Sequence, residues 1–146
     1  MYCNRKPSAR AIIKGSDKYP EICGEVLFYQ MKCDVLVSAR ISGLPKNESG
    51  FYGFHIHGGD SCDGDGFPKT GGHFNPSDKP HPQHAGDLPP LLYCSGNAHM
   101  EVKTDRFSIK EIIGKTVVIH GSTDDFRTQP SGDSGEKIAC GVIQKV

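Results

Sequence analysis

Apolar and polar residues alternate over short stretches of the chain, as they do in half-buried β-strands. The clearest alternation runs from Asp34 to Ser42. One predicted face carries Val35, Val37, Ala39 and Ile41, and the other carries Leu36, Ser38, Arg40 and Ser42. Similar patterns predict strands over residues 8–15, 22–30, 51–58, 90–94, 97–104, 115–120 and 138–144, with tight turns at Met31-Lys32 and Ser95-Gly96.

Two polar segments interrupt this pattern, Gly59 to Pro90 and Gly121 to Glu136. The first is rich in Gly, Pro, Asp and His, and is too long for an ordinary connection. Long loops inside a compact domain usually carry function. About eight short strands with two long loops predict an all-β fold, an antiparallel, immunoglobulin-like Greek-key β-sandwich or barrel. We expect residues 1–146 to form a single domain.

Composition excludes several classes of function. The 146 residues include 17 basic and 17 acidic side chains, so the chain lacks the basic field of a nucleic-acid-binding protein. Its apolar runs are too short to span a membrane, so we expect neither nucleic acid nor membrane as partner. Residues 1–14 are basic without an apolar stretch of secretory length, which favours the cytoplasm. An exported mature form with its signal removed would look the same and remains the alternative.

Histidines are concentrated where the regular pattern stops. Five of the seven fall within thirty residues, namely His55, His57, His73, His81 and His84. His55 and His57 alternate on a predicted strand, so both side chains leave one face and can converge on one metal ion. A structural histidine pair is the competing interpretation of these two residues.

The loop supplies a more specific set of ligands. His73, His81, His84 and Asp87 offer three imidazoles and a carboxylate, a complete donor set for tetrahedral zinc. The neighbouring prolines and glycines allow the loop to fold back on an ion. A polar surface loop that happens to be rich in histidine is the alternative.

His120 ends a later predicted strand and is followed by Asp124-Asp125. A lone histidine at a strand end is usually structural, and two loop acids are usually solvated. Metal-bound histidines, however, usually donate their second ring N–H to a carboxylate, which Asp124 could provide. Three imidazoles from strand ends suit a copper ion that changes oxidation state. The residues alone therefore predict a β protein with one or two metals, zinc together with a redox metal.

Nearly the whole chain resembles the copper/zinc superoxide dismutase family, and bacterial members most of all. The resemblance rests on six stretches in the family's order and spacing: GFHIH (53–57), GGHFNP (71–76), HAGDLP (84–89), VVIH (117–120), Asp124-Asp125 and ACGVI (139–143). It implies an enzyme that converts superoxide to dioxygen and hydrogen peroxide with copper and zinc as cofactors.

The resemblance also assigns roles residue by residue. The implied copper ligands are His55, His57, His73 and His120. The implied zinc ligands are His73, His81, His84 and Asp87. His73 would bridge the two metals and relay a proton, and Asp124 would link His55 to His81. The sequence leaves open whether the protein is a homodimer.

The six cysteines include no CxxC pair. Cys62 and Cys140 match the family's intrachain disulfide, with two buried free thiols as the alternative. Cys3, Cys23, Cys33 and Cys94 have no counterpart in the family, and we interpret them as ordinary thiols.

Two positions depart from the family pattern. Lys137 stands where the family carries an arginine beside the copper that attracts and orients superoxide, so the charge is kept but the planar fork is lost. Gly58 replaces an acidic residue. The charges of the second loop nearly cancel, Arg127 and Lys137 against Asp133 and Glu136. A copper- or zinc-binding protein without enzymatic activity, on the same fold, is therefore the rival interpretation.

Overall fold

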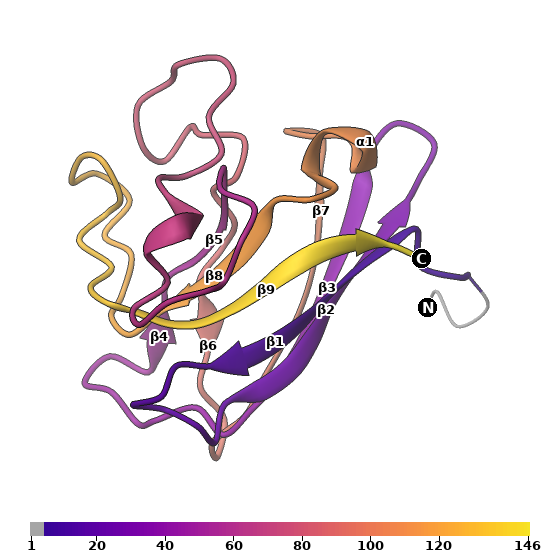
Figure 1. Ribbon diagram of the computed structural model, residues 1–146. Helices are drawn as coiled ribbons and strands as arrows, with labels where there is room; N and C mark the ends of the chain where they lie inside the picture. Colours follow the sequence, from indigo (N-terminus) through magenta and orange to yellow (C-terminus); the bar gives the residue numbers. More distant parts are fainter. Residues whose placement is uncertain (1–4) are drawn as a thin grey trace.

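Seven strands form one curled antiparallel sheet in the computed structural model, which describes residues 5–146 (Figure 1). In spatial order they are β5 (Phe54–His57), β8 (Thr116–His120), β9 (Lys137–Lys145), β1 (Ala9–Gly15), β2 (Cys23–Gln30), β3 (Val35–Ser42) and β7 (Ala98–Thr104). A two-stranded sheet pairs β4 (Phe51–Tyr52) with β6 (Leu91–Leu92). The architecture is the predicted all-β Greek-key barrel.

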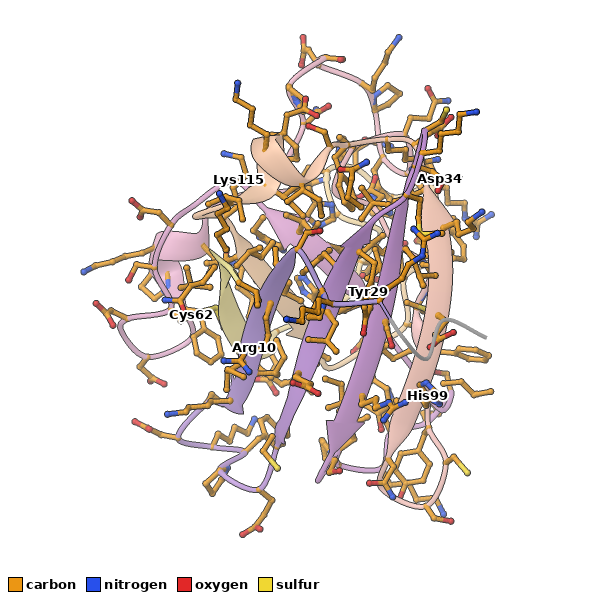
Figure 2. All side chains as sticks on the ribbon, turned by 90° about the vertical axis from the view of Figure 1, so that its right-hand side faces the viewer. Arg10, Tyr29, Asp34, Cys62, His99 and Lys115 are labelled. Carbon is orange, nitrogen blue, oxygen red and sulfur yellow. A yellow bond between two sulfur atoms is a disulfide. The ribbon has the colours of Figure 1, made fainter. Side chains whose placement is uncertain are left out.

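The core lies on the concave side of the seven-stranded sheet, and each of its seven strands contributes buried apolar side chains. In β1, Ala9, Ala11 and Ile13 are buried and alternate with exposed residues. The outward face carries exposed or half-exposed side chains such as Arg10, Tyr29 and His99 (Figure 2). This alternation confirms the strand pattern that the sequence predicts.

Strand β3 is more buried than its alternation predicts. Its inner face is buried as expected, but Leu36 and Ser38 on the other face are also only 3% and 6% exposed. Leu36 lies between Tyr29 and Lys103 of the adjacent strands, whose long side chains can cover it. Ser38 donates a hydrogen bond to Glu101 of β7.

The continuous strand predicted for residues 51–58 is wrong. The chain breaks at Gly53, so that β4 pairs with β6 while β5 pairs with β8. Gly53 N–H donates to Ser122 O, and its own carbonyl accepts from His120 N–H. This break raises the number of strands in the described residues to nine. Two short helices were also not predicted, η1 (Pro68–Thr70) and α1 (Ile109–Ile112).

The first long loop lies along the free edge of β5. Isolated bridges join His55 to Asp87 and His57 to His73, and Ile56 exchanges main-chain hydrogen bonds with Phe74 and Gly86. A Cβ atom at Gly86 would lie only 2.2 Å from the Ile56 carbonyl oxygen, so this close approach requires glycine. Both long loops lie on the left of Figure 1, beside β5 and β8. The predicted functional loops are thus gathered at one end of the barrel.

Candidate metal centre

Four imidazoles meet where β5, β8 and the first loop come together. They belong to His55 and His57 on β5, His120 at the end of β8, and His73 in the loop. One ring nitrogen of each lies within 4.8 Å of those of the other three. His55 and His57 are two residues apart on one strand, so their rings leave the same face, as the sequence predicts.

A second group shares His73 with the first. It consists of His73, His81, His84 and Asp87, and its four donor atoms also lie within 4.8 Å of one another. Asp87 is its centre: Oδ1 lies 2.7 Å from His73 Nδ1, and Oδ2 lies 3.0 Å from His81 Nδ1 and 3.2 Å from His84 Nδ1. The structure therefore brings together both sequence-predicted ligand sets, with His73 common to the two.

Asp124 connects the two groups from behind. Its Oδ2 accepts from His55 Nε2 and its Oδ1 from His81 Nε2, each at 2.7 Å. Burial works against the charged carboxylate, but the hydrogen bonds from His55, His81 and the Phe126 N–H outweigh it and hold the pKa of Asp124 well below its usual range. Asp124 is therefore an anion that orients one ring of each group.

The remaining rings are oriented by main-chain carbonyls. His57 Nδ1 donates to Gly71 O at 2.7 Å, and His120 Nδ1 donates to Gly135 O at 3.2 Å. These bonds leave the Nε2 atoms of His57 and His120 directed at each other, 3.1 Å apart. A hydrogen bond on one ring nitrogen fixes which nitrogen is free to bind a metal.

Burial favours the neutral form of four of these imidazoles and so lowers their pKa. It lowers the pKa of His57 to about 2 and that of His120 to about 3, and it also lowers the pKa of His55 and His84. A neutral imidazole has the lone pair that a metal ion requires. The protein therefore supplies these side chains in their ligating form.

Within residues 5–146, the buried ring nitrogens His55 Nδ1 and His73 Nε2 have no hydrogen-bond partner. The same is true of His81 Nδ1, which lies 3.0 Å from Asp87 Oδ2 but without the alignment of a hydrogen bond. Buried polar atoms without partners are rare in folded proteins, because their desolvation is not compensated. All three belong to the two groups. Four imidazoles suit copper, and three imidazoles with a carboxylate suit zinc, so the residues fit the two metals that the sequence predicts.

A cavity of about 420 Å³ opens beside the four-imidazole group. His57, His73 and His120 line it together with Lys137, which stands opposite His120 in the β8–β9 register. Burial lowers the pKa of the Lys137 amine. The other charges of the second loop do not line this cavity, and Glu136 binds Lys18 and Tyr19 instead. Lys137 is therefore the only charged side chain at the cavity among the four whose charges nearly cancel in the sequence, namely Arg127, Asp133, Glu136 and Lys137. The local charge at the cavity is positive.

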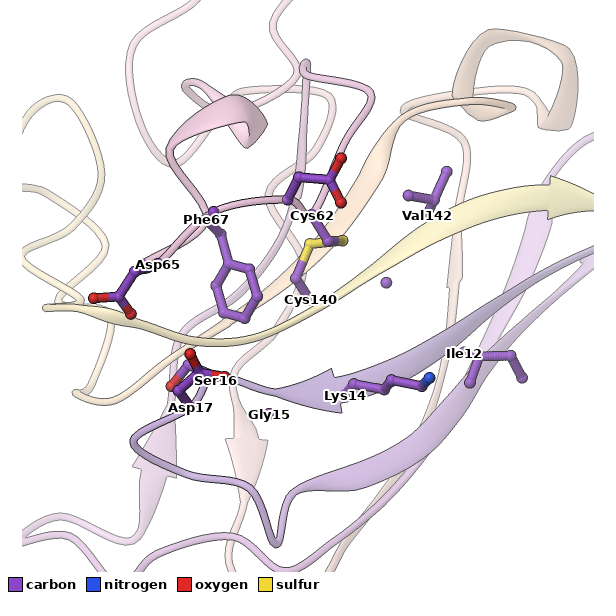
Figure 3. Close-up of a pocket in the computed structure, with 14 residues that line it drawn as sticks. Ile12, Lys14, Gly15, Ser16, Asp17, Cys62, Asp65, Phe67, Cys140 and Val142 are labelled. Carbon is purple, nitrogen blue, oxygen red and sulfur yellow. A yellow bond between two sulfur atoms is a disulfide. The ribbon is translucent and has the colours of Figure 1, made fainter.

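The predicted disulfide is confirmed. Cys62 in the first loop is bonded to Cys140 in β9, with their Cα atoms 5.8 Å apart. Cys23, Cys33 and Cys94 are free and exposed, whereas Cys3 lies outside the described residues. A hollow of about 490 Å³ adjoins the disulfide and is lined by Lys14, Asp17 and Phe67 among others (Figure 3). No histidine lines this hollow, so it is separate from the metal centre.

Sequence reasoning missed three residues that shape the site, Thr70, Gln129 and Gly132. Thr70 accepts a hydrogen bond from Lys137, and Gln129 binds the main chain of His81. Gly132 packs against Asp124 so closely that a Cβ atom would lie 2.0 Å from Asp124 Oδ1. No local sequence pattern could have identified these three contacts, because the two residues of each contact lie more than seven positions apart in the sequence.

Comparison with known proteins shows which proteins this chain is similar to. Residues 22–143 match the family model for copper/zinc superoxide dismutase (SODC). Superoxide dismutase (Cu-Zn) 1 of Aquifex aeolicus is 35% identical over 139 residues, covering 85% of this chain and 81% of the relative. Superoxide dismutase (Cu-Zn) of Deinococcus radiodurans is 32% identical over 162 residues, covering 97% and 86%. A crystal structure of a double mutant of an SOD-like protein from Bacillus subtilis superimposes with a TM-score of 0.83 at 28% identity, covering 92% and 96%.

Proposed function

The chain belongs to the copper/zinc superoxide dismutase family, and from this premise we propose which of its residues hold each metal. The protein is an oxidoreductase that converts superoxide to dioxygen and hydrogen peroxide with copper and zinc. One observation carries the residue assignment: two groups of donor atoms of different chemistry share the ring of His73.

Copper is assigned to the four-imidazole group, and zinc to the group that contains the carboxylate. The copper ligands are His55, His57, His73 and His120; the zinc ligands are His73, His81, His84 and Asp87. When bound, copper would supply one-electron redox chemistry towards superoxide, and zinc would supply a fixed charge that organises the loop. The lone partnerless nitrogens of His55, His73 and His81 support this assignment.

The side chains around the cavity perform the remaining tasks. Lys137 places a positive charge at the cavity, where it attracts the superoxide anion. His73 lines the cavity and has no partner at Nε2, so we propose that this nitrogen, when it is not bound to copper, holds one of the two protons that hydrogen peroxide needs. Asp124 keeps the rings of His55 and His81 in one orientation while charges change beside them.

Metal analysis combined with a superoxide-decay assay tests this assignment. After reconstitution the chain should hold one copper and one zinc and should accelerate superoxide decay. His73→Ala should lower the binding of both metals, because the ring belongs to both groups. His99→Ala is the matched control, since His99 is exposed on β7. Zinc alone after copper loading would contradict the copper assignment, and full metal content without activity would favour the metal-binding rival.

Two further proposals concern the partners and the cellular location of the enzyme. We propose that the enzyme acts without a nucleic-acid or membrane partner, which the balance of 17 basic and 17 acidic residues supports. No helix within residues 5–146 is long and apolar enough to cross a membrane. The Cys62–Cys140 bond supports the exported alternative over the cytoplasm, because such bonds persist in oxidising compartments. Cell fractionation tests the location, and sedimentation velocity tests whether the chain forms the homodimer that the sequence leaves open.

A further inference from the structure

The ammonium group of Lys137 is held by two acceptors from the first loop. Lys137 Nζ donates to Thr70 Oγ1 at 2.7 Å and to Gly71 O at 3.1 Å. Thr70 is the last residue of η1 and is completely buried, whereas its neighbours Lys69 and Gly71 are exposed. A hydroxyl in a fully buried position thus faces the ammonium of Lys137, the first residue of β9, which lines the cavity.

The orientation of the Thr70 hydroxyl is itself fixed. Its hydrogen is donated to Phe67 O at 2.9 Å, so an oxygen lone pair remains for the ammonium. A lysine head on a four-carbon stem has no preferred direction of its own, unlike the planar guanidinium of arginine. Two acceptors in fixed places restrict it, and hydrogen bonds from a charged donor are the stronger kind.

The same acceptors connect Lys137 to a copper ligand. Gly71 O accepts from His57 Nδ1 at 2.7 Å as well as from Lys137 Nζ. The ring of His57 and the ammonium therefore share one carbonyl, and Thr70 precedes it in the chain. An ammonium has three N–H donors, and these two bonds occupy two of them, so one remains for an anion in the cavity.

We propose that Thr70 is a positioning residue, which fixes the Lys137 ammonium at the cavity so that a lysine can orient superoxide. This inference rests on the proposed role of Lys137 in the enzyme. It does not require Thr70 to touch the substrate. The Thr70 hydroxyl restricts the position of the ammonium, and it thereby provides part of the rigidity that lysine lacks in comparison with arginine.

The first test measures the amine rather than the reaction. The copper- and zinc-loaded protein is treated briefly with acetic anhydride, and acetylation of each lysine is followed by peptide mass spectrometry. Lys137 should react more slowly than exposed Lys69. Thr70→Val should accelerate acetylation of Lys137 roughly threefold or more without changing Lys69, because it removes one of two anchors. Thr70→Ser keeps the hydroxyl and should restore slow labelling.

The second test is a double-mutant cycle on superoxide decay. Thr70→Val should lower the rate roughly threefold to tenfold when Lys137 is present, and should cause no further loss in a Lys137→Met background. A structural role of Thr70 alone would lower the rate equally in both backgrounds and would overturn the proposal. Thermal unfolding and metal content of each variant show that the sites compared are intact.

Two results of the labelling overturn the inference without any kinetic data. If Lys137 of the unaltered protein is acetylated as fast as Lys69, its ammonium is not held in place. This measurement needs no variant, so it remains valid even if Thr70→Val does not fold. If Thr70→Ser labels like Thr70→Val, the hydroxyl is not the anchor. Loss of activity in the unaltered, fully loaded protein would instead contradict the proposed function and leave the labelling result standing.

Discussion

Gln129 holds the main chain of His81 on both sides. Its Oε1 accepts from the His81 N–H at 2.8 Å, and its Nε2 donates to the His81 carbonyl at 2.8 Å. The two residues are 48 positions apart and belong to the two different long loops. The second loop therefore secures a proposed zinc ligand through its backbone, in addition to the contact of Asp124 with the His81 ring.

Gln129→Glu should accelerate zinc loss. The substitution keeps the acceptor for the His81 N–H but places a carboxylate oxygen against the His81 carbonyl, where a donor stood. Zinc transfer to a chelator should become roughly tenfold faster, the lower range for partners behind a metal ligand. Gln83→Glu changes the same charge on an exposed side chain and serves as the control. Equal zinc release from both variants would contradict a role for the Gln129 clamp.

Asp124→Asn should weaken metal binding by roughly 10- to 100-fold. An amide can accept from only one of the two imidazoles that Asp124 now joins, and it carries no charge. Competition titrations with a chelator measure both affinities, and circular dichroism should show an unchanged fold. Asp133→Asn, on the same loop and exposed, is the control. Affinities that match the unaltered protein would mean that Asp124 is only a loop acid.

Gly132→Ala should disturb the site more than another glycine of the same backbone conformation. Gly132 has φ of +74°, and an added Cβ would lie 2.0 Å from Asp124 Oδ1 and 2.6 Å from His81 Nε2. Gly114 has φ of +82° with nothing within 4 Å, so Gly114→Ala reports backbone strain alone. We expect Gly132→Ala to lose zinc and to melt at lower temperature than Gly114→Ala. Equal effects would show that the loop adapts to the methyl group.

Activity should decline at high pH because of Lys137. Burial lowers the pKa of this amine, and the charged form exists only below the pKa. As pH rises through that lowered value, the cavity loses its positive charge, earlier than with an ordinary lysine near 10.4. Lys137→Arg should stay charged and keep its rate. Lys137→Met should be roughly tenfold slower or more at neutral pH, with no decline from this group.

Superoxide decay at low salt, measured across this pH range, compares the three forms. Lys69→Met is the control, because Lys69 is exposed and does not line the cavity. A Lys137→Met profile that overlies that of the unaltered protein would show that Lys137 does not guide the substrate.

Breaking the Cys62–Cys140 bond should destabilise the fold by about 4–5 kcal/mol in the chain-entropy model, since it closes a loop of 78 residues. Denaturant unfolding of Cys62→Ser measures the loss, and Cys94→Ser, which removes an exposed free thiol, should change little. Alkylation without reductant should label Cys23, Cys33 and Cys94 but neither member of the bond. Labelling of Cys62 in fully active protein would contradict the role of the disulfide.

Local sequence patterns alone were sufficient to predict much of the fold of this protein. Alternation in β1 and β3 predicts buried faces because the side-chain period of a strand is a property of the backbone. The two long loops and their clustered histidines are also visible in the sequence. Gly53 shows the limit of such patterns: residues 51–58 read as one strand, and only the opposing loop at Ser122 and Ser134 divides them between two sheets.

The contacts that complete the site were decided by tertiary structure. His73 belongs to both donor groups because the first loop pairs with β5, and Lys137 faces the cavity because β9 runs beside β8. Thr70 and Gln129 act on partners 67 and 48 positions away. A hydrogen bond between distant residues depends on where the whole chain places two atoms, whereas a strand pattern depends on adjacent residues only. The sequence therefore determined which metal-ligating side chains the protein contains, and the tertiary fold determined which of them come together in one site.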